Sequence, residues 1–244
     1  MVAPVPKSRP LPTWVADFET GSLSQWQNNQ SCPDGVQVVT NPVRGGKYAA
    51  KLTVSDSSTK SNCPKVPTDN PRAQLVSDPL FREGDEFYVG FSTLFPNGFP
   101  VITDWFQVAE LYGEPWGGSP TMGIDVKGKR MVLARDQAYG WDDAWTAPVD
   151  IQTNAWIDIV MRVKFSTNPS VGFVEIWYNG QPQTMKNGSK RIYYETLRTG
   201  VNWNGSSPNR VFMNQYRSSN TPLGTVTIYH DEVRVGRSYE AVAP

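Results

Sequence analysis

The stretch WIDIVMRVKFSTNPSVGFVEIWYNGQP, residues 156–182, decides the fold class. In its first half, apolar residues occupy alternate positions from Ile157 to Phe165, with mostly charged residues between them. A period of two places one face of a β-strand on a core and leaves the other face in water. In its second half, Asn179 and Gly180 separate two strand-like runs and form the strongest short-range hairpin signal of the chain. The stretch therefore predicts antiparallel strands joined by tight turns.

The same alternation continues outward in both directions, at residues 48–54, 87–93 and 223–236. The 20 Gly and 20 Pro are scattered as turn signals, and no segment carries an apolar stripe at helical spacing behind a capping residue. Ten or more strands without an internal repeat favour a sandwich over a propeller. We expect an all-β fold with almost no helix: a two-sheet antiparallel jelly-roll sandwich, concanavalin A-like in form.

The 244 residues are expected to form one jelly-roll domain at 14–244, preceded by an extended arm at 1–13. Prolines at positions 4, 6, 10 and 12 fix φ and remove backbone donors, so the arm is not helical. We expect it to dock on its own domain or on a neighbouring subunit.

The charge balance and the hydropathy of the chain limit which classes of partner are expected. Lys and Arg number 23, as do Asp and Glu, so no basic excess favours nucleic acid. No apolar run reaches the length of a membrane-spanning helix, and residues 1–14 lack the apolar segment of a secretory signal. Either a signal was removed or the protein leaves its cell by another route. An extracellular (secreted) or virion-surface location is expected.

Two cysteines and two aspartates raise structural hypotheses. Cys32 and Cys63 lie in similar loop-like settings and are expected to form a disulfide rather than free thiols. Asp17 and Asp231 lie in the first and last predicted strands, which are often neighbours in jelly rolls. They either share a calcium ion or cap the strand ends by hydrogen bonds. No other cofactor is expected.

Several segments in order resemble the polysaccharide lyase family that includes heparin lyase I and related jelly-roll uronan lyases, a family with members among phage minor tail proteins. The likeness covers nearly the whole chain from Trp14 and rests on residues 16–26, 41–54, 72–75, 108–120, 156–180 and 214–242. It implies β-elimination on uronic acids: the site neutralises the sugar carboxylate, a base removes the C5 proton, and an acid protonates the leaving oxygen.

The resemblance points to paired side chains on strand faces. Arg72 and Gln74 share one face and are expected to hold a carboxylate and hydroxyls. Glu110 and Tyr112 share another and stand where the family has Gln-x-His, so Tyr112 is the candidate base or acid. A carboxylate at 110 repels a uronate unless it is protonated or paired with Arg72, its expected cross-strand partner. Tyr216 is a further candidate phenol.

Other residues are expected at the rim or in the core. Asn214 is a candidate substrate contact, and Trp116 and Trp141 are expected in Gly-rich loops, where an indole can stack on sugar rings or plug the sandwich. His230 lies in the last strand, and its context favours a structural role.

Two functions remain open from the sequence. The first is a lyase that binds, and cleaves by β-elimination, an acidic polysaccharide containing uronic acids. The alternative is a non-catalytic glycan-binding or structural surface protein of a virion, such as a phage tail or decoration protein. Fold alone does not separate the two.

Overall fold

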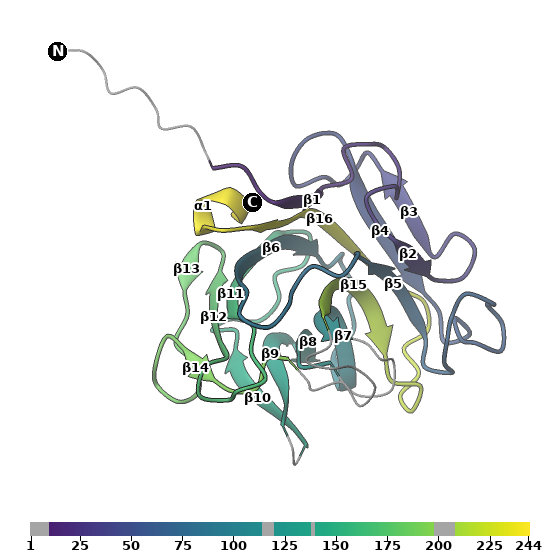
Figure 1. Ribbon diagram of the computed structural model, residues 1–244. Coiled ribbons are helices and arrows are strands. Elements are labelled where there is room, and N and C mark those ends of the chain that lie inside the picture. The colour runs from purple at the N-terminus through teal and green to yellow at the C-terminus, as the bar shows by residue number, and fades with distance from the viewer. Residues whose placement is uncertain (1–9, 114–119, 138–139, 198–207) are drawn as a thin grey trace.

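The chain folds as two antiparallel β-sheets packed face to face (Figure 1). The computed structural model describes residues 10–113, 120–137, 140–197 and 208–244. Sheet A has nine strands, in the order β13-β12-β11-β6-β16-β4-β3, with β1 paired to β16 and β14 to β12. Its strands are β1 (Trp14–Ala16), β3 (Val36–Val39), β4 (Ala49–Val54), β6 (Glu86–Leu94), β11 (Trp156–Lys164), β12 (Phe173–Tyr178), β13 (Gln181–Pro182), β14 (Ile192–Tyr193) and β16 (Val226–Gly236).

Sheet B has seven strands, in the order β10-β9-β8-β7-β15-β5-β2. They are β2 (Asn28–Gln30), β5 (Arg72–Val76), β7 (Ile102–Gly113), β8 (Met122–Gly128), β9 (Arg130–Gln137), β10 (Gly140–Thr146) and β15 (Asn209–Arg217). Within the described residues the only helix is α1 (Tyr239–Val242). The prediction of a two-sheet jelly-roll sandwich with almost no helix is therefore confirmed.

The core lies between the two sheets and follows the alternation that the sequence shows. On β11, Ile157, Ile159 and Met161 are buried in it. Near the end of that strand, Phe165 stacks on Phe81 with ring centroids 4.3 Å apart. Buried side chains of this size each contribute about 1.5–3 kcal/mol, so this interface holds the sheets together and fixes their relative position.

The hairpin signal forms the turn expected of it. Asn179 and Gly180 both have positive φ, at 48° and 78°, and connect β12 to β13. Two consecutive positive φ angles are what a type I′ turn requires, and Asn followed by Gly adopts them at low cost.

The first and last strands are neighbours, as expected: β1 pairs with β16, and Thr13 N donates to Val235 O at 2.7 Å. Most of the predicted arm, residues 1–9, lies outside the described residues, so its docking stays a prediction. No helix in the described ranges has the length and apolar character needed to cross a bilayer.

Cys32 and Cys63, the pair expected from the sequence, are joined by a disulfide. The bond ties the loop that precedes β5 to the segment that follows β2. Val66 is buried in this loop, and two residues later Thr68 receives a hydrogen bond from Arg72 of β5. The loop is thus held against sheet B at two points.

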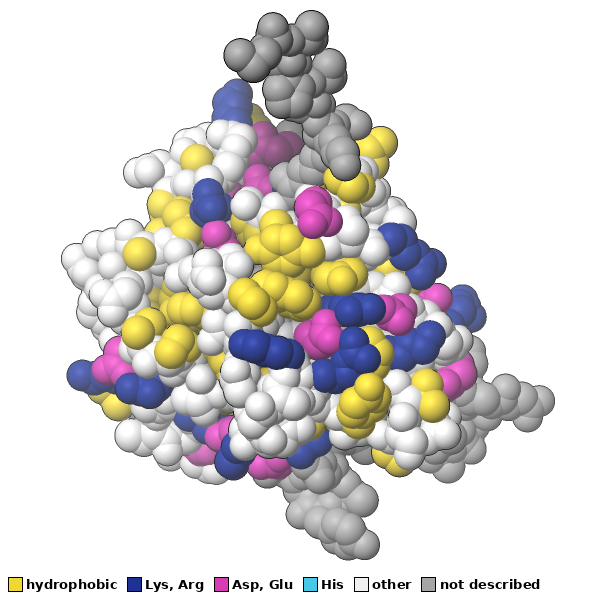
Figure 2. Space-filling model, turned by 90° about the vertical axis from the view of Figure 1, so that its left-hand side faces the viewer, with side chains coloured by type: hydrophobic (Ala, Val, Ile, Leu, Met, Phe, Trp, Pro, Cys, Tyr) yellow, Lys and Arg dark blue, Asp and Glu magenta, His cyan; other side chains and the backbone are white. Residues whose placement is uncertain are grey.

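Charged side chains of both signs intermingle with hydrophobic ones on the surface shown in Figure 2. On sheet A, Arg162 pairs with Glu86 at 2.6 Å and with Glu175 at 3.3 Å. These pairs are partly exposed, so each contributes little to stability. The buried polar and charged side chains that form a cavity lie on sheet B instead.

Candidate functional site

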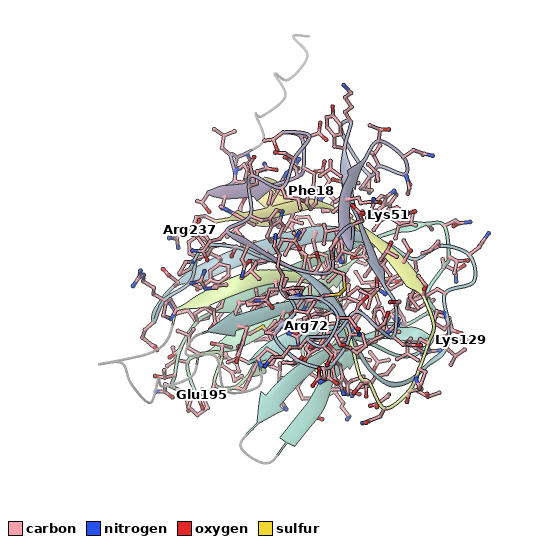
Figure 3. The ribbon with its side chains drawn as sticks, turned by 90° about the vertical axis from the view of Figure 1, so that its right-hand side faces the viewer. Phe18, Lys51, Arg72, Lys129, Glu195 and Arg237 are labelled. Atoms are coloured by element: carbon pink, nitrogen blue, oxygen red, sulfur yellow. A yellow bond between two sulfur atoms is a disulfide. The ribbon has the colours of Figure 1, made fainter. Side chains whose placement is uncertain are left out.

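A cavity of about 1080 Å³ lies on the face of sheet B that points away from sheet A. Its floor comes from β5, β15, β7, β8 and β9, and part of its wall from the loop held by the disulfide. The lining residues are Pro67, Thr68, Arg72, Gln74, Ile102, Thr103, Asp104, Trp105, Gln107, Glu110, Tyr112, Pro120, Asp125, Lys127, Gly128, Ala134, Phe212 and Tyr216. Figure 3 labels Arg72 near the middle of the molecule, above the projecting hairpin of β9 and β10.

The strand order explains how residues far apart in the sequence meet here. Strand β15 lies between β5 and β7, and its Tyr216 is paired with Arg72 on one side and Gln107 on the other. The expectation that Arg72 is the direct cross-strand partner of Glu110 is therefore wrong. Glu110 is paired with Phe212, and β15 separates it from β5.

A β-bulge in β7 brings a second set of polar residues to the cavity. Against β8, Gln107 pairs with Asp125 and Ala109 with Ile124, so Val108 is an extra residue. One extra residue reverses the alternation of the strand. Gln107, which simple alternation places on the face opposite Glu110, therefore shares its face, and β8 adds Asp125 beside them.

Arg72 is 6% exposed and is held by several contacts at once. Its Nη1 donates to Gln74 Oε1 at 2.7 Å, and its Nη2 donates to Thr68 Oγ1. Its guanidinium lies 3.7 Å from the centroid of the Tyr216 ring. Burial lowers the pKa of Arg72, while attraction to Tyr216 and Glu110 raises it. The result is a pre-positioned cation at the cavity wall.

Two carboxyl groups with little exposure lie in the same cavity. Glu110 and Asp125 are each 4% exposed. Burial raises the pKa of Glu110 to about 7, against the lowering effects of Arg72 and the Asn214 amide. Burial also raises the pKa of Asp125 well above its usual range, and the charge of Glu110 adds to this effect. Glu110 Oε1 and Asp125 Oδ1 have no hydrogen-bond partner among the described residues.

Asn214 supports the site from below. It is fully buried and is not among the residues that line the cavity, so a direct contact with substrate stays a prediction. Its Oδ1 accepts from Gln74 Nε2 at 3.0 Å, which fixes the orientation of the Gln74 amide. The sequence could not reveal this, since Asn214 has the parity of the cavity face but lies beneath its neighbours.

Two half-buried tyrosines line the cavity from β7 and β15. The Tyr112 ring packs against Phe212 at 5.8 Å, and the Tyr216 ring meets Trp105 edge-on at 4.7 Å. The four residues expected to cluster, Arg72, Gln74, Glu110 and Tyr112, all line this cavity together with Tyr216. Arg72 contacts Gln74 and Tyr216 directly. Trp105 was missed, because it reaches this face only through the bulge.

The two loop tryptophans have different outcomes. Trp116 lies outside the described residues. Trp141 is not in a loop: its backbone belongs to β10 and pairs with Asp136 of β9. The regular hairpin between these strands outweighs the local Gly signal that suggested a loop.

His230 has a structural environment. It is fully buried, its Nε2 lies 3.0 Å from the backbone O of Asn214, and its Nδ1 lies 2.9 Å from Thr93 Oγ1. Burial lowers its pKa to about 4, so the ring is neutral near pH 7. It braces β15 from the core side.

The two aspartates considered for calcium have protein partners. Asp231 Oδ2 accepts from the backbone N of Arg44 at 2.7 Å and of Gly45 at 3.2 Å. Asp17 Oδ2 lies 3.8 Å from Arg234 Nη2, and Asp17 Oδ1 accepts a hydrogen bond from Gln25 Nε2 at 3.2 Å. Within the described ranges no group of three metal-ligating side chains is present. Both residues form hydrogen bonds of the kind expected at strand ends, and a shared calcium ion stays a prediction.

Comparisons with known proteins agree on the architecture. A family model described as polysaccharide lyase matches residues 18–234. A search of curated proteins gave no match. Among solved structures, the chain is similar to the endo-β-1,4-glucuronan lyase of the fungus Trichoderma reesei, at 18% identity and a TM-score of 0.74, covering 96% of this chain and 98% of that one.

Two further similar structures belong to proteins with different activities. An alginate lyase from a Chlorella virus is 12% identical with a TM-score of 0.58, covering 93% of this chain and 100% of that one. The catalytic domain of a GH131 β-glucanase from Podospora anserina is 16% identical with a TM-score of 0.61, covering 94% and 97%. At these identities the likeness shows the fold, and the chemistry has to be argued from the site.

Proposed function

The chain belongs to the polysaccharide lyase family, and from this premise we propose that its cavity binds an acidic polysaccharide and cleaves it by β-elimination at a uronic acid. The observation that carries the proposal is the arrangement of Arg72 and Tyr216 on adjacent strands, with Tyr112 in the same cavity. β-Elimination requires a cation that binds the uronate carboxylate and, next to it, a base that removes the neighbouring proton. Arg72 and Tyr216 are placed for these two roles.

Arg72 is the group that we assign to the uronate carboxylate. Its guanidinium is anchored by Gln74 and Thr68, so little conformational freedom is lost when an anion binds. A guanidinium matches the two oxygens of a carboxylate in its fork geometry. As the C5 proton leaves, negative charge develops on the carboxylate, and a fixed cation stabilises that charge most.

Tyr216 is the candidate base. C5 is bonded to the carboxylate carbon, so the base must lie beside the group that holds the carboxylate, and the Tyr216 ring lies against Arg72. The phenolate takes the C5 proton, the C–H electrons form the C4–C5 double bond, and the C4–O bond breaks. Tyr112 is the candidate acid that protonates the leaving glycosidic oxygen.

An extracellular setting is part of the proposal. The Cys32–Cys63 disulfide supports it, because disulfides form and persist in oxidising environments. Polymeric substrates of this class are also met outside cells.

The test is an incubation with glucuronan, alginate, heparin and hyaluronan while the ultraviolet absorbance of the unsaturated uronate is followed. We expect a rise with at least one of them. Tyr216→Phe is expected to abolish it and Tyr112→Phe to lower it by about 10²-fold or more, while both variants still bind the polymer. Tyr193→Phe, an exposed residue of β14 on sheet A, is the matched control and is expected to leave the rate unchanged.

Binding without any rise in absorbance contradicts the lyase proposal. It is the result that the alternative function, a non-catalytic glycan-binding protein of a virion surface, predicts in the same assay. An unchanged rate in Tyr216→Phe removes that residue from the mechanism.

A further inference from the structure

Gly123 of β8 leaves a gap in the cavity floor between Glu110 and Asp125. It is the cross-strand partner of Glu110, and Asp125 is the next residue of β8 on the same face. A Cβ at Gly123 would lie 3.1 Å from Asp125 Oδ1 and 3.7 Å from Glu110 Cγ. Both acidic side chains therefore adjoin the same small space, and no side chain of β8 separates them.

The two carboxyl groups are buried with few partners: a hydrogen-bonding interaction with the Asn214 side chain lowers the pKa of Glu110, but no cation bonds directly to either acid among the described residues. Each has one oxygen with no hydrogen-bond partner, and neither forms an ion pair in the part of the chain that the structure describes. Two ionised carboxylates in such a space repel each other and lose their hydration. A carboxyl group that keeps its proton avoids both costs and gains a donor.

The surrounding charged groups do not remove this preference for a protonated carboxyl group. Arg72 of β5 attracts Glu110 from across β15 but bonds directly to Gln74 and Thr68. Lys127 of β8 lies 2.5 Å from Asp143 of β10, which neutralises it and adds a further negative group near Asp125. The other titratable groups of the described cavity lining are Asp104, Tyr112 and Tyr216. Burial raises the pKa of both acids, and the charge of Glu110 raises the pKa of Asp125 further.

We propose that Glu110 and Asp125 share a proton across the gap at Gly123, and that the protonated Glu110 donates a hydrogen bond that admits a uronate carboxylate to the cavity. This inference rests on the proposed function. Glu110 lines the cavity, so its proton can face a bound carboxylate, and Asp125 is a positioning residue that keeps the proton on the pair. When the pair ionises, it repels the same substrate, so the cavity is selective for uronates only below the pH at which the pair loses its proton.

The test is the affinity for a glucuronan oligosaccharide, measured by titration calorimetry from pH 5 to pH 9. For the wild-type protein we expect the affinity to fall about tenfold per pH unit above a midpoint near neutral pH. Glu110→Gln cannot ionise there and is expected to bind with less than about twofold change over the range. Asp125→Asn removes the like charge and is expected to move the midpoint to lower pH. Asp78→Asn, which changes an exposed carboxylate outside the cavity lining, is the matched control and is expected to keep the wild-type profile.

Wild-type binding that stays flat across this range overturns the inference while leaving the proposed function intact, as does a Glu110→Gln profile that falls like that of the wild type. No binding of glucuronan, alginate, heparin or hyaluronan at any pH overturns the proposed function together with the admission role. Proton sharing has a separate readout in the ¹³C resonances of the two carboxyl carbons. They are expected to titrate together, with Glu110 keeping a proton well above its ordinary range, and ionisation of both groups below pH 5 overturns the sharing.

Discussion

Replacement of Glu110 by Gln is expected to stabilise the folded protein at alkaline pH and to leave it unchanged in acid. The carboxyl group is 4% exposed, and its pKa is raised from 4.5 to about 7, chiefly by burial. Between these two pH values the folded protein holds a proton that the unfolded chain has already lost. Stability therefore falls as the pH rises through this window, and above it the loss stays constant.

The difference between 4.5 and about 7 corresponds to about 3 kcal/mol of unfolding free energy. Gln has nearly the same shape as a protonated Glu and cannot ionise. At pH 8 the Glu110→Gln variant should accordingly be more stable than the wild type by about 3 kcal/mol, and at pH 4 the two should agree within about 1 kcal/mol.

Urea unfolding followed by tryptophan fluorescence, with the disulfide intact, measures both values. The difference between variant and wild type cancels the titrating groups that do not interact with Glu110, because they behave alike in both proteins; Asp125 interacts with Glu110 and contributes to the difference. The Asp104→Asn variant serves as the reference for a half-buried carboxylate and should change the stability little at either pH. A Glu110→Gln protein that is less stable than the wild type at pH 8, or equally more stable at both pH values, refutes the reasoning.

Three further outcomes are expected. The double replacement of Cys32 and Cys63 by Ser should lower the unfolding free energy by about 3 kcal/mol in urea titrations, because a loop spanning 31 residues is no longer closed; an unchanged midpoint contradicts this. As the pH falls from 6.5 to about 4, the wild type should lose about 3 kcal/mol relative to His230→Gln, since the unfolded chain gains a proton that the buried His230 ring does not bind, while Glu110 acts in the opposite sense in both proteins; equal pH slopes in the two proteins contradict this. Gly90→Ala places a methyl group 2.3 Å from Val242 O, so it should destabilise the protein by about 1–3 kcal/mol in thermal or urea unfolding; a neutral result would show that α1 moves freely.

Much of the fold could be predicted because its determinants are local. Alternation along β11 and the Asn179-Gly180 turn each depend on a few adjacent residues, and the pairing of β12 with β13 follows from them. The strand order of sheet B could not be predicted in this way. It depends on which faces fit together across the sandwich, and this is why Arg72 and Glu110 were wrongly expected to be cross-strand partners.

The site residues could be predicted on regular strands, and the prediction failed where a strand contains a bulge. Arg72 and Gln74 point the same way because β5 pairs with β15 without interruption. Gln107 and Trp105 were missed because an extra residue in β7 cannot be seen in an alternating pattern. Asp125 did leave a signal, since an acid between Ile124 and Val126 of an apolar strand needs an explanation.

The extra residue at Val108 decides which side chains β7 presents to the cavity. Before Val108, odd-numbered residues such as Trp105 and Gln107 line the cavity. After Val108, even-numbered residues such as Glu110 and Tyr112 line it. Deletion of Val108 would join Gln107 to Ala109 in a regular strand, so Gln107 would still face the cavity and Phe106 the apolar interior. A β7 of the same length without the bulge would instead turn Phe106 toward the cavity and Gln107 toward the interior. The site therefore depends on the bulge itself, and a variant of this strand can lose Val108 more easily than it can lose the irregular pairing around it.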